Sequence, residues 1–278
     1  MRLALVVHPS RREAALVAGR VVAEAARLGM TVTATPHDCD RIPGCTERSD
    51  DGPDDADVVV AVGGDGTVLQ AVRLALAADV PVLGVNAGTV GFLTQAEPDG
   101  RLPEAIEALA AGDYTESRRM TLEARLPGRG PEPGLNDVVV EKAISQHVVK
   151  VALSVGPERL VEYRADAVIV ATPTGSTAYT FSAGGPLVDP ELDALIVSAV
   201  APHTLFSRPI VFRPGVRLRL EVVDDRPARV NVDGRPIGEL APGDVVEVVR
   251  GESEARFITL IPRNFATSVR HKFHLHDA

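Results

Sequence analysis

Short apolar runs alternate with helical patterns through the first part of the chain. The runs are rich in β-branched residues, as strands are, and the stretches between them carry apolar residues at the spacing of a helix. Such alternation is typical of a parallel sheet flanked by helices. We therefore predict an α/β N-terminal domain over residues 1–117, with a surface loop in the Asp-, Gly- and Pro-rich stretch 37–57. The expected strands are 3–7, 31–35, 58–62 and 81–85, and the expected helices are 11–28, 68–78 and 103–111.

The pattern changes beyond about residue 115, where short strand-like runs replace the helical stretches. Asp233-Gly234 separates two of these runs, and this dipeptide is typical of a tight hairpin turn. We predict a β-rich, sandwich-like second domain over residues 118–261. Its expected strands include 148–155, 160–164, 168–171, 218–223, 229–232, 235–240 and 245–249.

The composition limits the kind of protein. The chain has 278 residues, 45% of them hydrophobic, which is enough for one large domain or two smaller ones. A net charge of −9 gives no general attraction for nucleic acid or an anionic membrane, so we expect neither partner. The apolar stretches fall far short of the ~20 residues of a membrane-spanning helix. The run at 3–7 is too short for a signal-peptide core, so we expect a cytoplasmic protein.

A glycine-rich loop at residues 63–67, Gly-Gly-Asp-Gly-Thr, joins the expected strand 58–62 to the expected helix 68–78. At a helix start, unpaired backbone amides and the helix dipole favour an anion such as phosphate. The glycines allow a ligand to approach the main chain, and Thr67 is expected to cap the helix. The alternative is a structural strand-to-helix connection, which is at least as common for such a turn alone.

Asp65 lies between the glycines of this loop, so its carboxylate would project into the space that phosphates would occupy. A triphosphate repels a carboxylate, which suggests a chemical purpose for the acid. It can accept the proton of an attacking hydroxyl group, orient that group, or help to hold a metal ion. We therefore predict that Asp65 is the base of a phosphoryl transfer.

A second loop, residues 172–186, follows the expected strand 168–171 and is dense in hydroxyl groups. Ser and Thr side chains suit ribose and phosphate oxygens, and Tyr179 offers a flat face for a base. The same composition is typical of a solvent-exposed turn. The length of the loop and its position after a buried strand favour ligand binding.

Taken together, these motifs resemble the NAD kinase family. Residues 63–67 are similar to the family's G-G-D-G-T signature, which diacylglycerol and sphingosine kinases share. The stretch T-P-T-G-S-T-A-Y at 172–179, with S-A-G-G-P at 182–186, is similar to the family's NAD-binding loop and is more specific. Residues 202–209 also fit. The sequence is thus identified as a member of the bacterial type of this family, which includes ATP-NAD kinases and kinases that use inorganic polyphosphate or ATP.

The resemblance implies transfer of a phosphoryl group from ATP to the 2′-hydroxyl of the adenosine ribose of NAD, giving NADP. It implies Asp65 as the catalytic base, a homo-oligomer (dimer or tetramer), and a C-terminal segment, 262–278, that returns to the first domain. Mg²⁺ or another divalent cation is expected to arrive with ATP, because no cluster in the sequence has the ligands of a dedicated metal site. The implied phosphate-binding residues are Gly63, Gly64, Gly66 and Thr67. The implied NAD-binding residues are Asp65, Gly66, Asn136, Asp137, His147, Arg164, Asp166, Thr177, Ala178, Tyr179, Thr180, Phe181, Ser182 and Arg235.

Two positions depart from the family's pattern. Ala167 follows Asp166 where the family usually has glycine, so its methyl group is expected either to crowd the dinucleotide or to force a different backbone angle. Thr89-Val90 stands where His-Leu is common.

Alternatives remain for single residues and for the function. Taken alone, Asn136 is explained as a turn cap, His147 as an edge histidine, and Arg164 as the surface ion-pair partner of Asp166. The alternative functions are a lipid or small-alcohol kinase with the same acid-bearing loop, and a non-catalytic dinucleotide-binding regulator. The first does not account for the second loop, and the second would be expected to lack Asp65.

Overall fold

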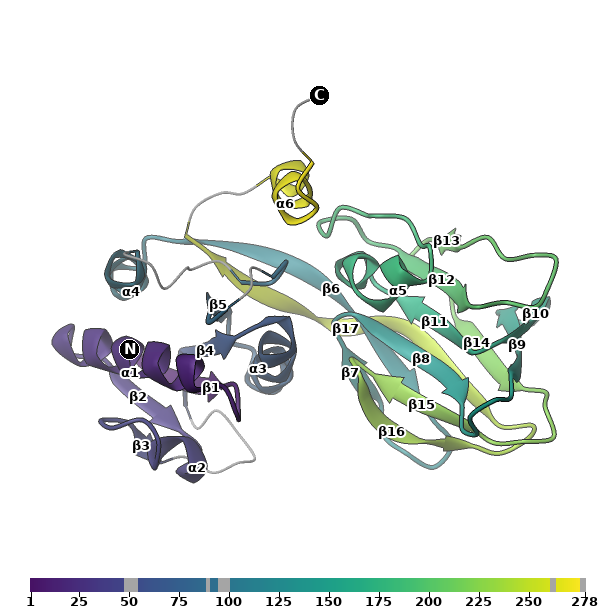
Figure 1. Ribbon diagram of the computed structural model, residues 1–278, viewed down its shortest axis with the longest axis horizontal. Helices are drawn as coiled ribbons and strands as arrows, with labels where there is room; N and C mark the ends of the chain where they lie inside the picture. Colours follow the sequence, from purple (N-terminus) through teal and green to yellow (C-terminus); the bar gives the residue numbers. More distant parts are fainter. Residues whose placement is uncertain (48–54, 89–90, 95–100, 261–263, 276–278) are drawn as a thin grey trace. The chain divides into compact units, whose positions relative to one another are not determined.

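The computed structural model describes residues 1–47, 55–88, 91–94, 101–260 and 264–275 (Figure 1). The chain divides into two compact units, residues 1–118 with 255–278 and residues 119–254. Two strands, β6 (Thr115–Arg125) and β17 (Val245–Thr259), have residues in both units. Each unit is described by itself below.

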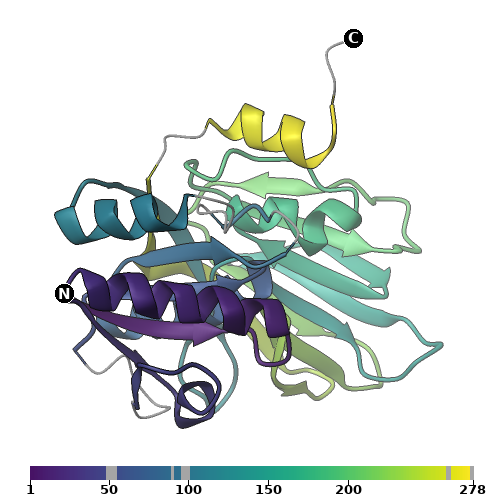
Figure 2. The ribbon, with the colours of Figure 1, turned by 60° about the vertical axis from the view of Figure 1, so that its left-hand side comes forward.

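The first unit is built around a parallel sheet, as the alternating pattern predicts (Figure 2). Its strands run in the order β3-β2-β1-β4-β5, and each neighbouring pair is parallel. The last residues of β17 extend the sheet, with Phe257 opposite Val82. β4 and β5 are buried at every residue, as expected of strands covered on both faces. The strand bounds are β1 (Arg2–Val7), β2 (Thr31–Ala34), β3 (Thr46–Glu47), β4 (Val58–Gly63) and β5 (Val82–Asn86).

Helices cover both faces of this sheet. α1 and α4 share a core cluster with Leu83 and Val85 of β5. Gly84, the residue between them, faces Val68 of α3, so α3 packs on the opposite face. The helix bounds are α1 (Arg12–Arg27), α2 (Pro36–Cys39), α3 (Asp65–Ala78), α4 (Leu102–Ala111) and α6 (Phe265–Lys272).

Two local expectations for the first unit are wrong. α3 begins at Asp65 rather than at residue 68, so Gly64 is the N-cap residue and Thr67 already lies inside the first turn. Thr67 therefore does not cap the helix. The predicted loop 37–57 contains part of the short helix α2 and the strand β3, which pairs with β2. Residues 48–54 of that loop lie outside the described residues.

The second unit is antiparallel and β-rich, as predicted. One of its sheets has the order β10-β9-β14-β17, with β6 beside β17 and β7 beside β6, and the other has the order β13-β12-β11-β8-β15-β16. The registered pairs within the unit are antiparallel. The remaining bounds are β7 (Glu132–Gly134), β8 (Asp137–Lys142), β9 (Val149–Val155), β10 (Glu158–Ala165), β11 (Ala167–Ala171), β12 (Leu195–Val200), β13 (Ile210–Phe212), β14 (Leu218–Val222), β15 (Ala228–Val232) and β16 (Arg235–Leu240).

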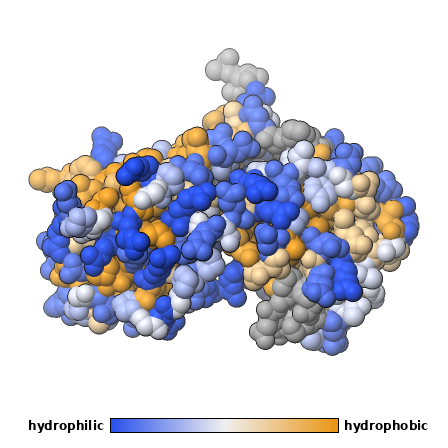
Figure 3. Space-filling view, turned by 180° about the vertical axis from the view of Figure 1, so that it is seen from behind, coloured by the Kyte–Doolittle hydropathy of each residue, from blue (hydrophilic) through white to orange (hydrophobic). Residues whose placement is uncertain are grey.

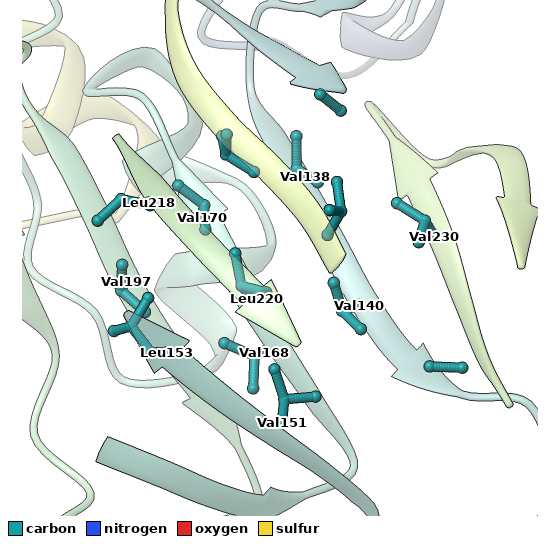
Figure 4. Close-up of a cluster of buried hydrophobic side chains, with 14 of the residues drawn as sticks. Val138, Val140, Val151, Leu153, Val168, Val170, Val197, Leu218, Leu220 and Val230 are labelled. Atoms are coloured by element: carbon teal, nitrogen blue, oxygen red, sulfur yellow. The ribbon is translucent and has the colours of Figure 1, made fainter. Parts of the chain in front are cut away.

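Alternate residues of β11 serve two different faces of its sheet. Val168 and Val170 point into the core between the two sheets, toward Leu153 and Leu220 (Figure 4). The alternate residues Ala167 and Ile169 lie on the other face and pack against residues of the loop that follows β11. The hydroxyl-rich loop is thereby seated on the outer face of the sheet.

The predicted hairpin at Asp233-Gly234 is confirmed. β15 and β16 pair in antiparallel register on either side of it. Asp233 and Gly234 have φ values of 50° and 74°, the two left-handed conformations that a tight hairpin turn requires.

The surface carries both hydrophilic and hydrophobic residues. On the face in Figure 3, hydrophilic residues are interspersed with hydrophobic ones. Among the described residues, no helix is long and apolar enough to cross a membrane.

Leu220→Ala is expected to lower the free energy of unfolding by about 2–5 kcal/mol, because Leu220 is fully buried in the core of the second unit and its loss leaves a cavity. Leu160→Ala is the matched control, because Leu160 is 51% exposed, and a change below about 0.5 kcal/mol is expected. Chemical denaturation measures both. Equal losses in the two variants would contradict the assignment of the core.

Candidate active site

The glycine-rich turn carries the chain from the end of β4 into α3. Gly64 has extended backbone and precedes the first helical turn, which Asp65, Gly66 and Thr67 form. The amides of Thr67 and Val68 donate to the Gly64 carbonyl oxygen at 2.9 and 3.2 Å. The amides of residues 64–66 come before these first helical hydrogen bonds and are directed out of the helix start. The turn therefore has the geometry of an anion site at the N-terminus of a 14-residue helix.

The carboxylate of Asp65 is fixed by main-chain hydrogen bonds. Oδ2 accepts from the amide of Phe92 and Oδ1 from the amide of Leu93, both at 3.1 Å. These amides lie beyond β5, the strand next to β4, and the ends of neighbouring parallel strands meet at one edge of the sheet. Each carboxylate oxygen keeps capacity for a further hydrogen bond, so Asp65 can still receive a proton from a ligand.

A pocket of about 380 Å³ opens beside this carboxylate. Its walls come from the segment after β1, the turn at 64–67, Gly91, and α6. Two wall residues, Arg11 and Lys272, are cationic, and they line the same pocket as the turn at the helix start. Cations and open amides together suit a ligand with several negative charges.

Arg11 and Lys272 are not among the site residues that the sequence predicts. Arg11 follows β1, a parallel neighbour of β4, so it lies at the same edge of the sheet as the glycine-rich turn. This position after a predicted strand is the signal by which the sequence could have indicated Arg11. Lys272 lies in α6, and no local pattern predicts its partner. In the structure Lys272 lines the pocket, and its Nζ lies 5.6 Å from the centroid of the Phe92 ring.

In the second unit, the hairpin residue Asp233 fastens the segment 135–137. Its carboxylate accepts from the amides of Leu135, Asn136 and Asp137 at 2.8, 2.7 and 3.1 Å. Asp233 also donates its own amide to the carbonyl oxygen of Asp137. The backbone of the predicted Asn136-Asp137 pair is thus set by the turn, a role that the sequence did not reveal.

Both acids of this group have a raised pKa. Burial raises the pKa of Asp137 to about 7, and the neighbouring carboxylate of Asp233 adds to the rise. Burial also raises the pKa of Asp233, while its three amide partners act in the opposite direction. Asp137 therefore changes protonation near neutral pH.

The hydroxyl-rich loop is attached to the same segment. The Thr172 hydroxyl donates to the Leu135 carbonyl oxygen and accepts from the Gly175 amide. A Cβ atom on Gly175 would lie 2.0 Å from the Asn136 carbonyl oxygen, so only glycine fits there. Beyond it lie the 3₁₀ helix η1 (Thr174–Thr177) and the short helix α5 (Tyr179–Ser182).

Tyr179 lies beside several predicted site residues. Burial raises the pKa of its phenol, and the carboxylates of Glu141, Asp166 and Asp137 raise it further. Tyr179 and Phe181 are each 40% exposed, whereas Thr180 is buried. The second unit thus gathers Asn136, Asp137, Asp166 and the loop residues Thr177, Ala178, Tyr179, Thr180, Phe181 and Ser182.

Other predicted residues lie elsewhere or have a different partner. Asp166 pairs with Lys142 rather than with Arg164, because β8 and β11 are neighbours and the Lys142 amide donates to the Asp166 carbonyl oxygen. Arg164 is exposed on β10, in the other sheet. His147 is exposed between β8 and β9, and Arg235 pairs with Glu132 at 2.7 Å.

The two departures from the family pattern have different outcomes. Ala167 begins β11 in regular register with Glu141 and Val200, so it forces no left-handed backbone angle. Its methyl group is buried against the cluster around Ile169. Thr89 and Val90 lie outside the described residues.

Comparisons with known proteins now identify the family. The ATP-NAD kinase N-terminal domain matches residues 46–114, and the ATP-NAD kinase C-terminal domain matches residues 135–260. An NAD kinase from Symbiobacterium thermophilum is 37% identical over 279 residues, covering 98% of each chain. One from Heliobacterium modesticaldum is 44% identical over 221 residues, covering 78% of each chain. The chain belongs to the NAD kinase family.

Solved structures agree with the NAD kinase fold. Yeast NADH kinase in complex with NADH superposes with a TM-score of 0.89, covering 100% of this chain and 89% of the other at 21% identity. An Archaeoglobus fulgidus NAD kinase in complex with ATP gives 0.75, covering 92% and 93% at 27% identity. Membership of the NAD kinase family makes the chain a phosphotransferase and confirms the predicted function. The lipid-kinase and non-catalytic alternatives have no support in these comparisons.

Asp137→Asn is expected to change how stability depends on pH. Folded wild-type protein keeps the Asp137 proton up to about pH 7, whereas the unfolded chain loses it near its ordinary value of 3.8. Between these values the folded state binds more protons, so wild-type stability falls relative to the variant as pH rises. Above about pH 7 the difference in the free energy of unfolding between wild type and variant becomes constant. Denaturant unfolding from pH 4 to 8 measures it, and a difference that is constant over the whole range would contradict the burial argument.

Proposed function

We propose that the chain makes NADP from NAD and ATP with Asp65 as the catalytic base. The observation that carries the proposal is the position of the Asp65 carboxylate in the pocket beside the open amides of the α3 N-terminus. An acid and an anion site in one pocket match what phosphoryl transfer to a hydroxyl group requires.

The donor is proposed to bind with its terminal phosphates over the turn formed by Gly63, Gly64, Gly66 and Thr67. The amides and the helix dipole favour negative charge there, and the absence of side chains at the glycines lets the phosphates approach the main chain. Arg11 and Lys272 supply positive charge from the pocket walls. Together they offset the repulsion between a triphosphate and Asp65.

The reaction then needs one proton acceptor. The 2′-hydroxyl of the adenosine ribose donates its hydrogen bond to Asp65, which takes the proton as the oxygen attacks the terminal phosphorus. The new bond joins the 2′-oxygen to phosphorus, the bond to the bridging oxygen breaks, and ADP leaves. A loose transition state requires alignment more than a strong base, so a carboxylate suffices.

NAD contacts are proposed in each unit separately, Asp65 and Gly66 in the first and the cluster around Asn136 in the second. Asn136, Asp137 and Asp166 offer polar groups for ribose hydroxyls, and Tyr179 offers a ring face for a base. The remaining proposed contacts are Thr177, Ala178, Thr180, Phe181, Ser182, His147, Arg164 and Arg235. The NADH bound by the yeast relative supports a dinucleotide as the ligand of this fold.

ATP is the proposed donor, with Mg²⁺ or another divalent cation arriving on it. The ATP complex of the Archaeoglobus fulgidus relative supports this donor. The ion is proposed to be part of the substrate, bound through the phosphates of ATP. Inorganic polyphosphate is the competing donor, and assays with each compound decide between them.

We further propose a cytoplasmic homo-oligomer, a dimer or a tetramer. β13 ends the strand order of its sheet, and two apolar side chains are exposed, Val211 in β13 and Leu205 in the segment before it. Exposed apolar residues of this kind are often buried between subunits. Light scattering on the purified protein tests the assembly.

Asp65→Asn is expected to lower the rate of NADP formation about 10²-fold or more, because the amide keeps the shape of the side chain but cannot take the proton. Purified protein is incubated with NAD, ATP and Mg²⁺, and NADP is followed with an NADP-specific dehydrogenase. Asp79→Asn is the control, because Asp79 ends the same helix and its side chain is 91% exposed. Full activity of Asp65→Asn would contradict the base role, and no NADP from the wild type would contradict the function.

Arg11→Met and Lys272→Met are each expected to raise the KM for ATP about tenfold, because one charge-assisted hydrogen bond to phosphate is lost. The KM for NAD is expected to stay within about twofold in both variants. Arg12→Met is the matched control, since Arg12 is next in sequence to Arg11 but is not among the lining residues of the pocket. Unchanged KM values for ATP in both variants would remove Arg11 and Lys272 from the donor site.

A further inference from the structure

The catalytic carboxylate is held by residues outside its own helix. Asp65 is the first residue of α3, where the helix itself leaves the side chain a choice of rotamers. Consecutive amides, those of Phe92 and Leu93, bind one carboxylate oxygen each at 3.1 Å. Two hydrogen bonds to two different oxygens fix both the position of the carboxylate and the rotation of its plane.

Gly91 makes this arrangement possible by having no side chain. A Cβ atom on Gly91 would lie 1.9 Å from Oδ1 of Asp65 and 2.6 Å from its Cγ. The φ of Gly91 lies outside the left-handed region, so the requirement for glycine comes from space and not from backbone conformation. Any other residue at position 91 therefore forces the Asp65 side chain to move.

The segment that carries the two amides is itself packed against α6. The Phe92 ring lies 6.0 Å from the Phe273 ring, centroid to centroid, with the planes tilted by 49°. The ammonium group of Lys272 lies within cation–π distance of the Phe92 ring. These contacts restrain the residue whose amide binds Oδ2 of Asp65.

We propose that Gly91, with the amides of Phe92 and Leu93, forms a clamp that sets the catalytic position of Asp65. Gly91 is a positioning residue in this clamp and touches no substrate in the proposal. The inference rests on the proposed role of Asp65 as the base. It adds that the rate depends on the place of the carboxylate as well as on its presence.

Gly91→Ala is the variant that tests the clamp. The added methyl group meets the end of a side chain, which can rotate away, so the variant is expected to fold. Rotation takes the carboxylate off both amides and out of line with the 2′-hydroxyl. A misplacement of about 1 Å can cost about 10²-fold in rate, so kcat is expected to fall by ~10- to 100-fold while the KM values for NAD and ATP stay within about twofold.

Gly19→Ala is the matched control. It makes the same substitution in the same unit, and a Cβ atom on Gly19 has no neighbour within 4 Å. Its kcat is expected to equal that of the wild type. Thermal unfolding of both variants separates loss of folded protein from loss of rate.

A double-variant cycle shows whether Gly91 acts through Asp65. When Asn replaces Asp65 there is no base left to misplace, so adding Gly91→Ala is expected to lower kcat by less than about twofold further. A full additional loss in the double variant would mean that Gly91 acts in another way and would overturn the proposal. Wild-type kcat in Gly91→Ala would overturn it as well.

A crystal structure of Gly91→Ala keeps the test independent of activity. The Asp65 carboxylate is expected to have left the Phe92 and Leu93 amides, beyond hydrogen-bond distance. If the wild type makes no NADP, the proposed function fails, and this structure still decides the clamp. A carboxylate that remains on both amides beside Ala at position 91 would overturn it.

Discussion

Carboxylates that accept hydrogen bonds from main-chain amides determine the local structure at the predicted sites of both units. Asp65 binds two consecutive amides beyond β5 in the first unit, and Asp233 binds three amides of segment 135–137 in the second. Asp65 accepts two such hydrogen bonds and Asp233 accepts three. They fix the segment after β5 and the segment that joins β7 to β8.

These contacts also explain where glycine is required. Gly91 lies against the Asp65 carboxylate, and Gly175 lies against the Asn136 carbonyl oxygen. Neither residue has a left-handed φ, so in both cases the main chain needs space. A glycine in a binding motif thus has two separate uses, to let a ligand approach and to let the chain approach itself.

The sequence predicted the architecture because the spacing of apolar residues reflects which side chains are buried. It predicted the parallel sheet, the change to β structure and the hairpin at Asp233-Gly234. It misplaced the start of α3, since the first turn at 65–67 carries polar or small residues and adds no apolar signal. It ended the last strand near residue 249, although β17 continues to Thr259 through polar positions such as Glu252.

The sequence did not predict which residues from distant parts of the chain contact one another. Arg11 reaches the pocket because β1 and β4 are neighbours, and Lys272 because α6 packs near Phe92. Asp166 meets Lys142 because β8 and β11 are paired, whereas Arg164, two positions away in sequence, lies on a strand of the other sheet. Local patterns find elements and motifs, but the topology decides which charges meet.

We propose that Asp65, fixed by two amides, receives the proton of the 2′-hydroxyl. A crystal structure of the wild-type protein with NAD and a non-hydrolysable ATP analogue tests it most directly. We expect the 2′-oxygen of the adenosine ribose within hydrogen-bond distance of an Asp65 oxygen, about 3 Å, while the Phe92 and Leu93 amides still donate to the carboxylate. A 2′-oxygen bound to a different residue, with Asp65 out of reach, would contradict it.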